Sequence, residues 1–386
     1  MDFRLETKYR VGGLASLSDI WGDFIIYRRL QPADPRLPSF EDLRPILGLR
    51  EKTLPRKTDP HYGRFVAELL RRARWLELPG QSIERLVYIG DTQMNDGTAF
   101  LHICAAGRWP GWAFIGQEEM TRPPRVQVQG RLYLANRWSS LFDFIEQLEK
   151  DQGFGLDEAT AVVIDMDKTA IGAKGRNDRV IDRVRLESIK RTVADCLGPG
   201  FDNRALEAAY AELKKPAYHP FTADNQDYLA YICLMLGAGL CGLEELAGQV
   251  RAGAMRAFDD FIFRMEKLRP DLARTGLGPL HDEVCRTFRE GDPTPFKKFR
   301  SNEYLATAAC FGGFPDGPLE QTLDERIVIT QEVQQAAARL GQKGALIFGL
   351  SDKPDEASVP QPDQAAAGMK ALHRLDTLVV GACNVL

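Results

Sequence analysis

Two carboxylates stand two residues apart at the end of an apolar segment. Asp165 and Asp167 follow the run 162–164, Val-Val-Ile, which has the composition of a buried strand. Where a strand passes into a loop, one Asp can act as a nucleophile and the other as a separate acid or base. Two negative charges this close favour a divalent cation, and oxygen ligands favour Mg²⁺. The alternative is a solvated turn in which the pair occurs by chance.

Polar residues follow two other apolar runs in the same way. The run 86–89 is typical of a strand and leads into Gly90, Asp91 and Asp96, and the run 345–350 ends at Ser351. Parallel strands present their carboxyl ends at one edge of a sheet, where ligands bind. We therefore expect all three polar groups to gather at a single edge.

Helical patterns alternate with these apolar runs. Residues 61–78 and 331–340 have apolar side chains at helical spacing, and the helix-like stretch 364–375 precedes one more apolar run at 377–380. Wholly apolar strands that alternate with helices predict an α/β protein with a parallel sheet. Between 170 and 325 the pattern is helical and strands are few, which predicts an inserted helical domain.

These groups of residues resemble the motifs of the haloacid-dehalogenase-like phosphohydrolases. In that family the motifs run from first to fourth, whereas here the third and fourth come before the first and second, which is a circular permutation. The resemblance implies a Rossmann-like core formed by 1–169 and 326–386, with 170–325 as a helical cap. The matching residues are Asp165, Asp167 and Thr169 for the first motif, Ser351 for the second, Lys57 with Pro60 for the third, and Asp91 and Asp96 for the fourth.

The resemblance also implies an activity, that of a Mg²⁺-dependent phosphatase acting on a small phosphorylated metabolite. Asp165 would form an aspartyl-phosphate, and Asp167 would protonate the leaving oxygen and then activate water. The presence of Asp167 argues against dehalogenation. The implied phosphate ligands are Thr169, Ser351 and Lys57, with Lys353 as an alternative to Lys57 and loop capping as an alternative role of Thr169; the implied metal ligands are Asp165, Asp167, Asp91 and Asp96.

Two other functions remain open on the sequence. A protein of this kind could bind phosphate for regulation and turn over poorly, since a fold and a motif do not guarantee a reaction. The segment 237–242 satisfies GxGxxG, which in a βαβ unit would bind a dinucleotide and would indicate an NAD(P)-dependent oxidoreductase. That interpretation needs a strand before Gly237, and the preceding residues have helical spacing instead.

Composition narrows the range of partners. The 386 residues carry 50 basic and 54 acidic side chains, a net charge of −4, which gives no reason to expect nucleic acid or an anionic membrane. The uncharged segment 228–243 is shorter than a membrane span and is predicted to be a buried helix. Seven cysteines without a CxxC pair, and a charged start without a signal peptide, predict a cytoplasmic protein. No pattern indicates an oligomeric state.

Overall fold

The computed structural model describes residues 8–49, 53–151, 153–198, 201–313 and 317–383. The chain forms two compact units. Unit 1 comprises Met1–Ile181, Ala308–Val359 and Ala365–Leu386, and unit 2 comprises Asp182–Thr307 and Pro360–Gln364. The segment 170–325 expected from the sequence to be a separate domain thus extends beyond unit 2 at both ends.

The centre of unit 1 is a seven-stranded sheet. Neighbouring strands run parallel except for the last pair, which is antiparallel. This confirms the predicted α/β class with a mostly parallel sheet. In spatial order the strands are β2 (Ile25–Ile26), β9 (Leu346–Leu350), β7 (Thr160–Asp165), β3 (Arg85–Gly90), β4 (Gly111–Gly116), β6 (Leu132–Ala135) and β5 (Val126–Gln129).

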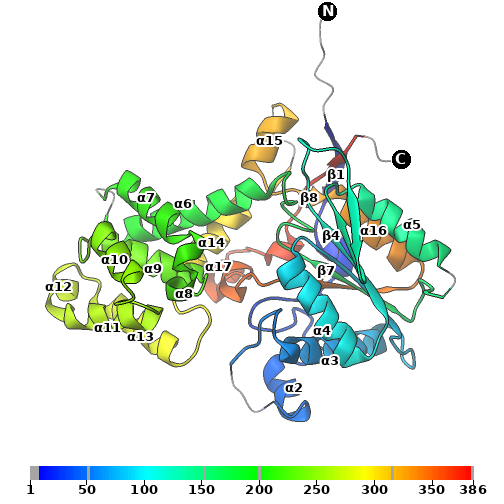
Figure 1. Cartoon of the computed structure of the whole chain (residues 1–386), viewed down its shortest axis with the longest axis horizontal. Helices are drawn as coiled ribbons and strands as arrows, with labels where there is room; N and C mark the ends of the chain where they lie inside the picture. The colour runs from blue at the N-terminus through cyan, green and yellow to red at the C-terminus, as the bar shows by residue number, and fades with distance from the viewer. Residues whose placement is uncertain (1–7, 50–52, 152, 199–200, 314–316, 384–386) are drawn as a thin grey trace, which may run out of the picture. The chain divides into compact units, whose positions relative to one another are not determined.

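Helices cover both faces of this sheet (Figure 1). On one face lie α3 (Pro60–Glu77) and α4 (Thr98–Gly107), and on the other lie α5 (Ser140–Lys150) and α16 (Gln331–Gln342). Because both faces are covered, the central strands are buried over almost their whole length and carry apolar residues along their middle, as the sequence indicated. The remaining short helices of unit 1 are α1 (Ser18–Trp21), α2 (Phe40–Ile46), α15 (Leu319–Glu325), the single turns Asp355–Ala357 and Leu372–Arg374, and the π-helical turn η1 (Gln93–Gly97).

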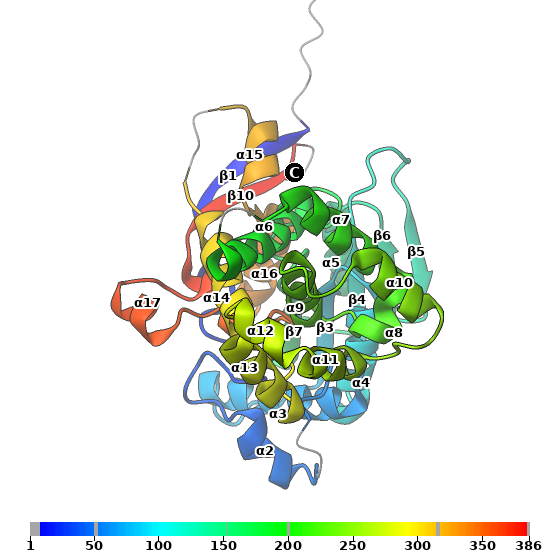
Figure 2. The same cartoon turned by 90° about the vertical axis from the view of Figure 1, so that its left-hand side faces the viewer.

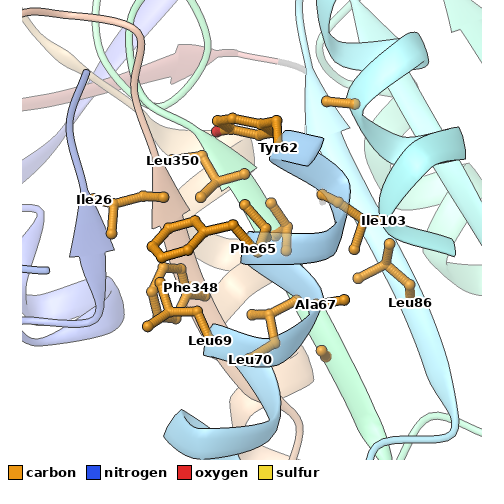
Figure 3. Packing of buried hydrophobic residues seen from close by; sticks show 14 of the residues in the cluster. Ile26, Tyr62, Phe65, Ala67, Leu69, Leu70, Leu86, Ile103, Phe348 and Leu350 are labelled. Atoms are coloured by element: carbon orange, nitrogen blue, oxygen red, sulfur yellow. The ribbon is translucent and has the colours of Figure 1, made fainter. Parts of the chain in front are cut away.

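Helix α3 begins at a strong N-terminal signal and buries a continuous apolar stripe. Asp59 caps the helix by accepting a hydrogen bond from the backbone N–H of His61 (2.8 Å), and Pro60 occupies the first helical position. Phe65 and Leu69 pack against Phe348 of β9 in the core of unit 1 (Figure 3). The cap fixes where α3 starts, and so fixes the turn directly before it.

Helices α3 and α4 approach each other closely at Gly63. A Cβ atom on Gly63 would lie 2.5 Å from the carbonyl carbon of His102, which is shorter than any normal contact. The absence of a side chain at Gly63 therefore allows this helix pair to pack over the sheet.

A second, three-stranded sheet joins the two ends of the chain. Its order is β1 (Tyr9–Ala15), β10 (Thr377–Ala382) and β8 (Ile329–Thr330), with β1 antiparallel to β10 (Figure 2). The expected strand 377–380 exists but does not belong to the parallel sheet. An apolar run reveals that a segment is a buried strand and does not reveal which strands it pairs with.

The helix expected over 364–375 is wrong for most of its length. Helix α17 (Pro362–Ala366) ends early, and only a single turn at Leu372–Arg374 follows. Gly368 has a φ of +89°, a left-handed conformation that interrupts a helix. The alanines and leucines of the segment 364–375 give a helical pattern, but Gly368 interrupts the helix.

Unit 2 is helical, and its described residues contain no strand. Its core is rich in aromatic side chains, with Tyr231 and Phe258 among the rings in contact. A buried ion pair between Arg300 and Asp227 also lies in this unit. None of the helices in the described residues is long and apolar enough to cross a membrane. The helices are α6 (Asp178–Leu197, which starts in unit 1), α7 (Asn203–Leu213), α8 (His219–Thr222), α9 (Gln226–Gly237), α10 (Leu243–Arg251), α11 (Phe258–Lys267), α12 (Arg269–Arg274), α13 (Gly278–Arg289) and α14 (Lys297–Ala309), with a 3₁₀ turn at Pro216–Tyr218.

The close approach of α3 and α4 predicts that Gly63→Ala destabilises unit 1 by about 1–3 kcal/mol, the usual cost of overpacking a core. The matched control is Gly341→Ala in α16, where the added Cβ would meet only an ordinary contact at 3.8 Å. That control should be neutral or slightly stabilising because Ala favours a helix. Thermal unfolding of the two variants measures the difference, and equal melting temperatures would contradict the packing described for Gly63.

Candidate functional site

Three adjacent strands bring the predicted polar groups to one edge of the sheet. Strand β7 lies between β9 and β3, with Asp165 opposite Leu350 and Ile164 opposite Ile89. The residues that follow β9 and β3, Ser351 and Asp91, therefore leave the sheet at the level of Asp165. The expectation that these groups share one edge is met by this register.

Lys57 joins the acidic groups from a different part of the chain. It lies in the turn before α3, which is closed by a hydrogen bond from the N–H of Asp59 to the carbonyl of Arg56 (2.8 Å). Its Nζ is 2.5 Å from Asp165 Oδ1 and 2.8 Å from Asp96 Oδ1. All three side chains are at most 6% exposed. Lys57 is thus a buried ammonium shared by two carboxylates.

Arg28 anchors the segment that precedes Lys57. Its guanidinium donates to the carbonyl of Pro55 (2.9 Å), and its backbone N–H donates to the carbonyl of Lys353 (3.1 Å). Arg28 therefore holds both the loop that carries Lys57 and the loop that follows β9.

Asp96 is held by hydrogen bonds on both oxygens. Oδ1 accepts from Lys57 and from the Tyr88 hydroxyl (3.0 Å), and Oδ2 accepts from the backbone N–H groups of Asp91 and Thr92 and from the Thr92 hydroxyl. The π-helical turn η1 places Asp96 directly over Gly90, where a Cβ would lie 2.5 Å from the Asp96 Cβ. Gly90 is therefore required for this carboxylate to sit where it does.

Asp91 meets a second amine. Lys174 Nζ is 3.2 Å from Asp91 Oδ2 and donates to the Asp91 carbonyl (2.8 Å). One carboxylate oxygen each from Asp91, Asp96 and Asp165 lies within 4.8 Å of the others. Three carboxylates and two amines thus share one small volume.

The three carboxylates differ in how well the protein compensates their charge. Burial would raise the pKa of Asp96, but Lys57 and the hydrogen bonds from Thr92 hold it at about 2, below the usual 3.8. Burial raises the pKa of Asp165 well above its usual value, against the attraction of Lys57 and with further repulsion from Asp96 and Asp91. Burial and the nearby Asp96 likewise raise the pKa of Asp91 to about 6, in spite of Lys174. The protein alone therefore favours ionised Asp96 and disfavours ionised Asp165 and Asp91.

The other predicted site residues lie near this edge without joining the acidic cluster. Asp167 is half-buried, and no hydrogen bond or ion pair connects its side chain to the described part of the chain. Ser351 is 2% exposed, and its hydroxyl accepts from the backbone N–H of Lys353 (3.0 Å). Thr169 is fully buried, and its hydroxyl has no partner among the described residues, so the alternative role of capping the loop is not seen. Of the two candidate lysines, Lys57 is the one that contacts Asp165.

The loop after β7 is fixed by a buried ion network. Arg176 is fully buried and pairs with Glu118 (2.6 Å), which follows β4, and with Glu332 (2.9 Å) at the start of α16. It also donates to the carbonyl of Val380 in β10 (3.1 Å). The network therefore holds the segment that carries Lys174 in place beside Asp91.

Sequence reasoning missed Lys174 and Tyr88. Lys174 follows Asp165 by nine residues and lies in a glycine-containing segment, which predicts a loop. A lysine in a loop that follows an acidic pair was the signal that could have identified it. Tyr88 carried no signal, because an aromatic residue inside a strand is ordinary core composition. Only its position opposite Asp96 gives it a role.

Two other features of the chain do not form functional sites. Glu266, His281 and Cys285 of unit 2 lie close enough to hold a metal. Glu266, however, pairs with arginines, and His281 bonds to the Tyr231 hydroxyl through Nδ1, so the protein already satisfies these groups. The GxGxxG segment 237–242 follows helix α9 and not a strand, so the dinucleotide interpretation is wrong.

Comparisons of the chain with protein-family models, with curated proteins and with solved structures gave no match. The arrangement of residues described above is therefore the basis for any functional conclusion.

The opposite pKa shifts predict opposite effects of two isosteric substitutions in buffer with EDTA. Asp96→Asn should destabilise unit 1 by about 2 kcal/mol at pH 7, because its lowered pKa means that folding stabilises the ionised form. That contribution is present above about pH 4 and is lost as the pH falls toward 2. Asp165→Asn should instead raise the melting temperature at pH 7, because ionised Asp165 costs stability there.

The Asp165→Asn gain should shrink as the pH falls toward 3.8 and disappear below it, where Asp165 is protonated in both the folded and unfolded states. Asp143→Asn on the exposed face of α5 is the matched control and should change neither curve. Thermal unfolding from about pH 2 to pH 8 measures all three variants. A melting temperature for Asp165→Asn below that of the wild type would show that the charge balance described here is incorrect.

Proposed function

We propose that this protein is a Mg²⁺-dependent phosphohydrolase of permuted haloacid-dehalogenase-like fold, with unit 2 as its cap. The observation that carries the proposal is the buried carboxylate of Asp165 at the end of a central parallel strand, in contact with Lys57 and close to Asp91. Phosphoryl transfer requires mainly positioning and charge neutralisation, and these are the resources that the site contains. The substrate would be a small phosphorylated metabolite.

The donor set at the sheet edge suits a hard divalent cation. Among the described residues no hydrogen bond reaches Asp165 Oδ2 or Asp91 Oδ1, and the raised pKa values of both groups mean that their negative charge is not fully compensated. Carboxylate oxygens of this kind are typical Mg²⁺ ligands. Asp165, Asp91 and the Asp167 carbonyl would hold the ion, which when bound neutralises charge on the phosphoryl group. Asp96 would support this site, since both of its oxygens are already bonded.

The residues of the chain then divide the reaction between them. A carboxylate oxygen of Asp165 attacks phosphorus, the bond from phosphorus to the leaving oxygen breaks, and an aspartyl-phosphate remains. Asp167 gives its proton to the leaving oxygen and then, as a carboxylate, takes a proton from the water that releases phosphate and restores Asp165. Lys57 holds the phosphoryl oxygens and offsets the charge around Asp165.

One observation favours the second candidate, a protein that binds phosphate and turns over weakly. Ser351 and Thr169, both implied phosphate ligands, are 2% and 0% exposed, and the Ser351 hydroxyl is already engaged by the N–H of Lys353. Lys57 is as buried as these two hydroxyls and already pairs with Asp165 and Asp96, so the site would have few groups left to orient the phosphoryl oxygens. Phosphate binding without release of phosphate from esters would select this alternative.

Hydrolysis of p-nitrophenyl phosphate tests the nucleophile. Wild-type protein should release phosphate with Mg²⁺ and not with EDTA, and Asp165→Asn should lower kcat by at least about 10³-fold because the attacking group is removed. Asp143→Asn again serves as the control, since this exposed carboxylate lies outside the site. An unaltered rate in Asp165→Asn would reject Asp165 as the nucleophile.

Asp167 has a more specific signature. Asp167→Asn should slow hydrolysis of an alkyl phosphate such as glycerol 3-phosphate far more than that of p-nitrophenyl phosphate, because nitrophenolate leaves without protonation. We expect at least a tenfold difference between the two losses in kcat/KM. If both substrates slow equally, Asp167 does not act as the general acid.

A further inference from the structure

Beside the acidic cluster, unit 1 contains a pocket whose lining residues, apart from Asp91, have no part in the proposed chemistry. Its volume is about 610 Å³, within the range of small-molecule sites, and it lies at the carboxyl ends of β3, β4 and β6. Asp91 and Lys174 belong to its wall, so the pocket begins where the candidate active site ends. We call it the side pocket.

The side pocket has an excess of positive charge at its outer wall. Lys174 is engaged by Asp91, and Arg122 pairs with Glu119 (3.3 Å). Arg125 also lines the pocket, and within the described ranges no carboxylate or other acceptor meets its guanidinium. A planar guanidinium without a partner is well suited to bind a carboxylate or a phosphate in bidentate fashion.

The loop that carries the two arginines is preformed. Pro123 and Pro124 lie between Arg122 and Arg125 and restrict the backbone there. The Arg125 N–H donates to Asn136 Oδ1 (2.6 Å), and the Asn136 side chain donates to the Pro123 carbonyl (2.9 Å). The backbone of a loop held in this way loses little entropy when a ligand binds.

Arg137 fastens the other end of the same loop. Its guanidinium donates to the carbonyls of Glu119 (2.7 Å) and Arg122 (2.5 Å). Asn136 and Arg137, which follow β6, thus hold the loop at several points along its backbone.

The lining limits the kind of ligand. None of the residues that line the side pocket is aromatic, so it offers no surface for stacking a nucleobase. Amides such as Gln117 and Gln127 can hydrogen-bond to hydroxyl groups of a ligand, and apolar residues that include Ile115 and Leu134 can contact its carbon chain. The arginines add a preference for negative charge.

We propose that the side pocket holds the leaving group of a phosphate ester that carries a second anionic group, either a carboxylate or another phosphate, and that Arg125 recognises that group. This inference rests on the proposed function. Hydrolysis breaks the bond between phosphorus and the ester oxygen, and the alcohol that retains the second anion is released from the side pocket. The pocket selects the substrate, and the acidic cluster carries out the reaction.

Matched substrate pairs test this inference on the full-length protein with Mg²⁺. The first pair is 3-phosphoglycerate and glycerol 3-phosphate, which differ by one carboxylate, and the second is fructose 1,6-bisphosphate and fructose 1-phosphate, which differ by one phosphate. For at least one pair, the wild-type kcat/KM should be about 10- to 100-fold higher for the ester with two anionic groups. The pair that shows the preference identifies the source of the second anion.

Arg125→Ala should bring the ratio of kcat/KM between the two members of that pair close to one, mainly by raising KM for the ester with two anionic groups. Arg125→Lys should retain part of the preference. Arg131→Ala is the matched control, because Arg131 lies in the turn between β5 and β6 and does not line the side pocket. It should change neither ratio. A wild type that hydrolyses p-nitrophenyl phosphate but shows no preference in either pair, or a preference that survives in Arg125→Ala, overturns the inference and leaves the proposed function intact.

A wild type that hydrolyses none of these esters rejects the proposed function, and calorimetry then tests the side pocket alone. Tighter binding of 3-phosphoglycerate than of glycerol 3-phosphate, lost in Arg125→Ala, would support the pocket as an anion site. Equal binding of the two compounds would overturn it.

Discussion

The ammonium of Lys57 is the interaction on which the rest of the site depends. It lies between Asp165 at the end of β7 and Asp96 in the π-helical turn after β3, and all three groups are almost completely buried. An isolated charge at such depth would cost several kcal/mol, and two carboxylates without a cation would repel each other as well. The anchoring of the Lys57 turn by Arg28, the cap of α3 and the absence of a side chain at Gly63 all fix where this one amine sits.

The carboxylates around Lys57 differ in how far the protein compensates their negative charge. This difference separates a structural role from the role proposed in catalysis. Asp96 receives every hydrogen bond that its oxygens can use, so its role is to hold the amine and the loop after β3. Asp165 and Asp91 are left with charge that the fold does not neutralise. Groups that destabilise a protein in this way are retained where a reaction or a ligand requires them.

The parts of the fold and of the candidate site that could be predicted from the sequence are those that a short run of neighbouring residues indicates. The strands before Asp91, Asp165 and Ser351 were predictable because each is a short apolar run that ends at a polar residue, and their common edge followed from parallel pairing. Lys57 was found only through a resemblance, since its contact with Asp165 joins residues 108 positions apart. The pairing of β1 with β10 and the ion pair of Lys174 with Asp91 were not predicted, because long-range partners leave no local pattern.

The pairing of Tyr9 with Ala382 also has a consequence for biosynthesis. Strand β1 leaves the ribosome well before residues 377–382 and has no partner in its sheet until they have been made. Lys57 likewise emerges well before Asp165, so its amine stays in water until the middle of the chain arrives. Unit 1 is therefore completed only after residues 377–382 have been made, and until then β1 is a segment that a chaperone would have reason to shield.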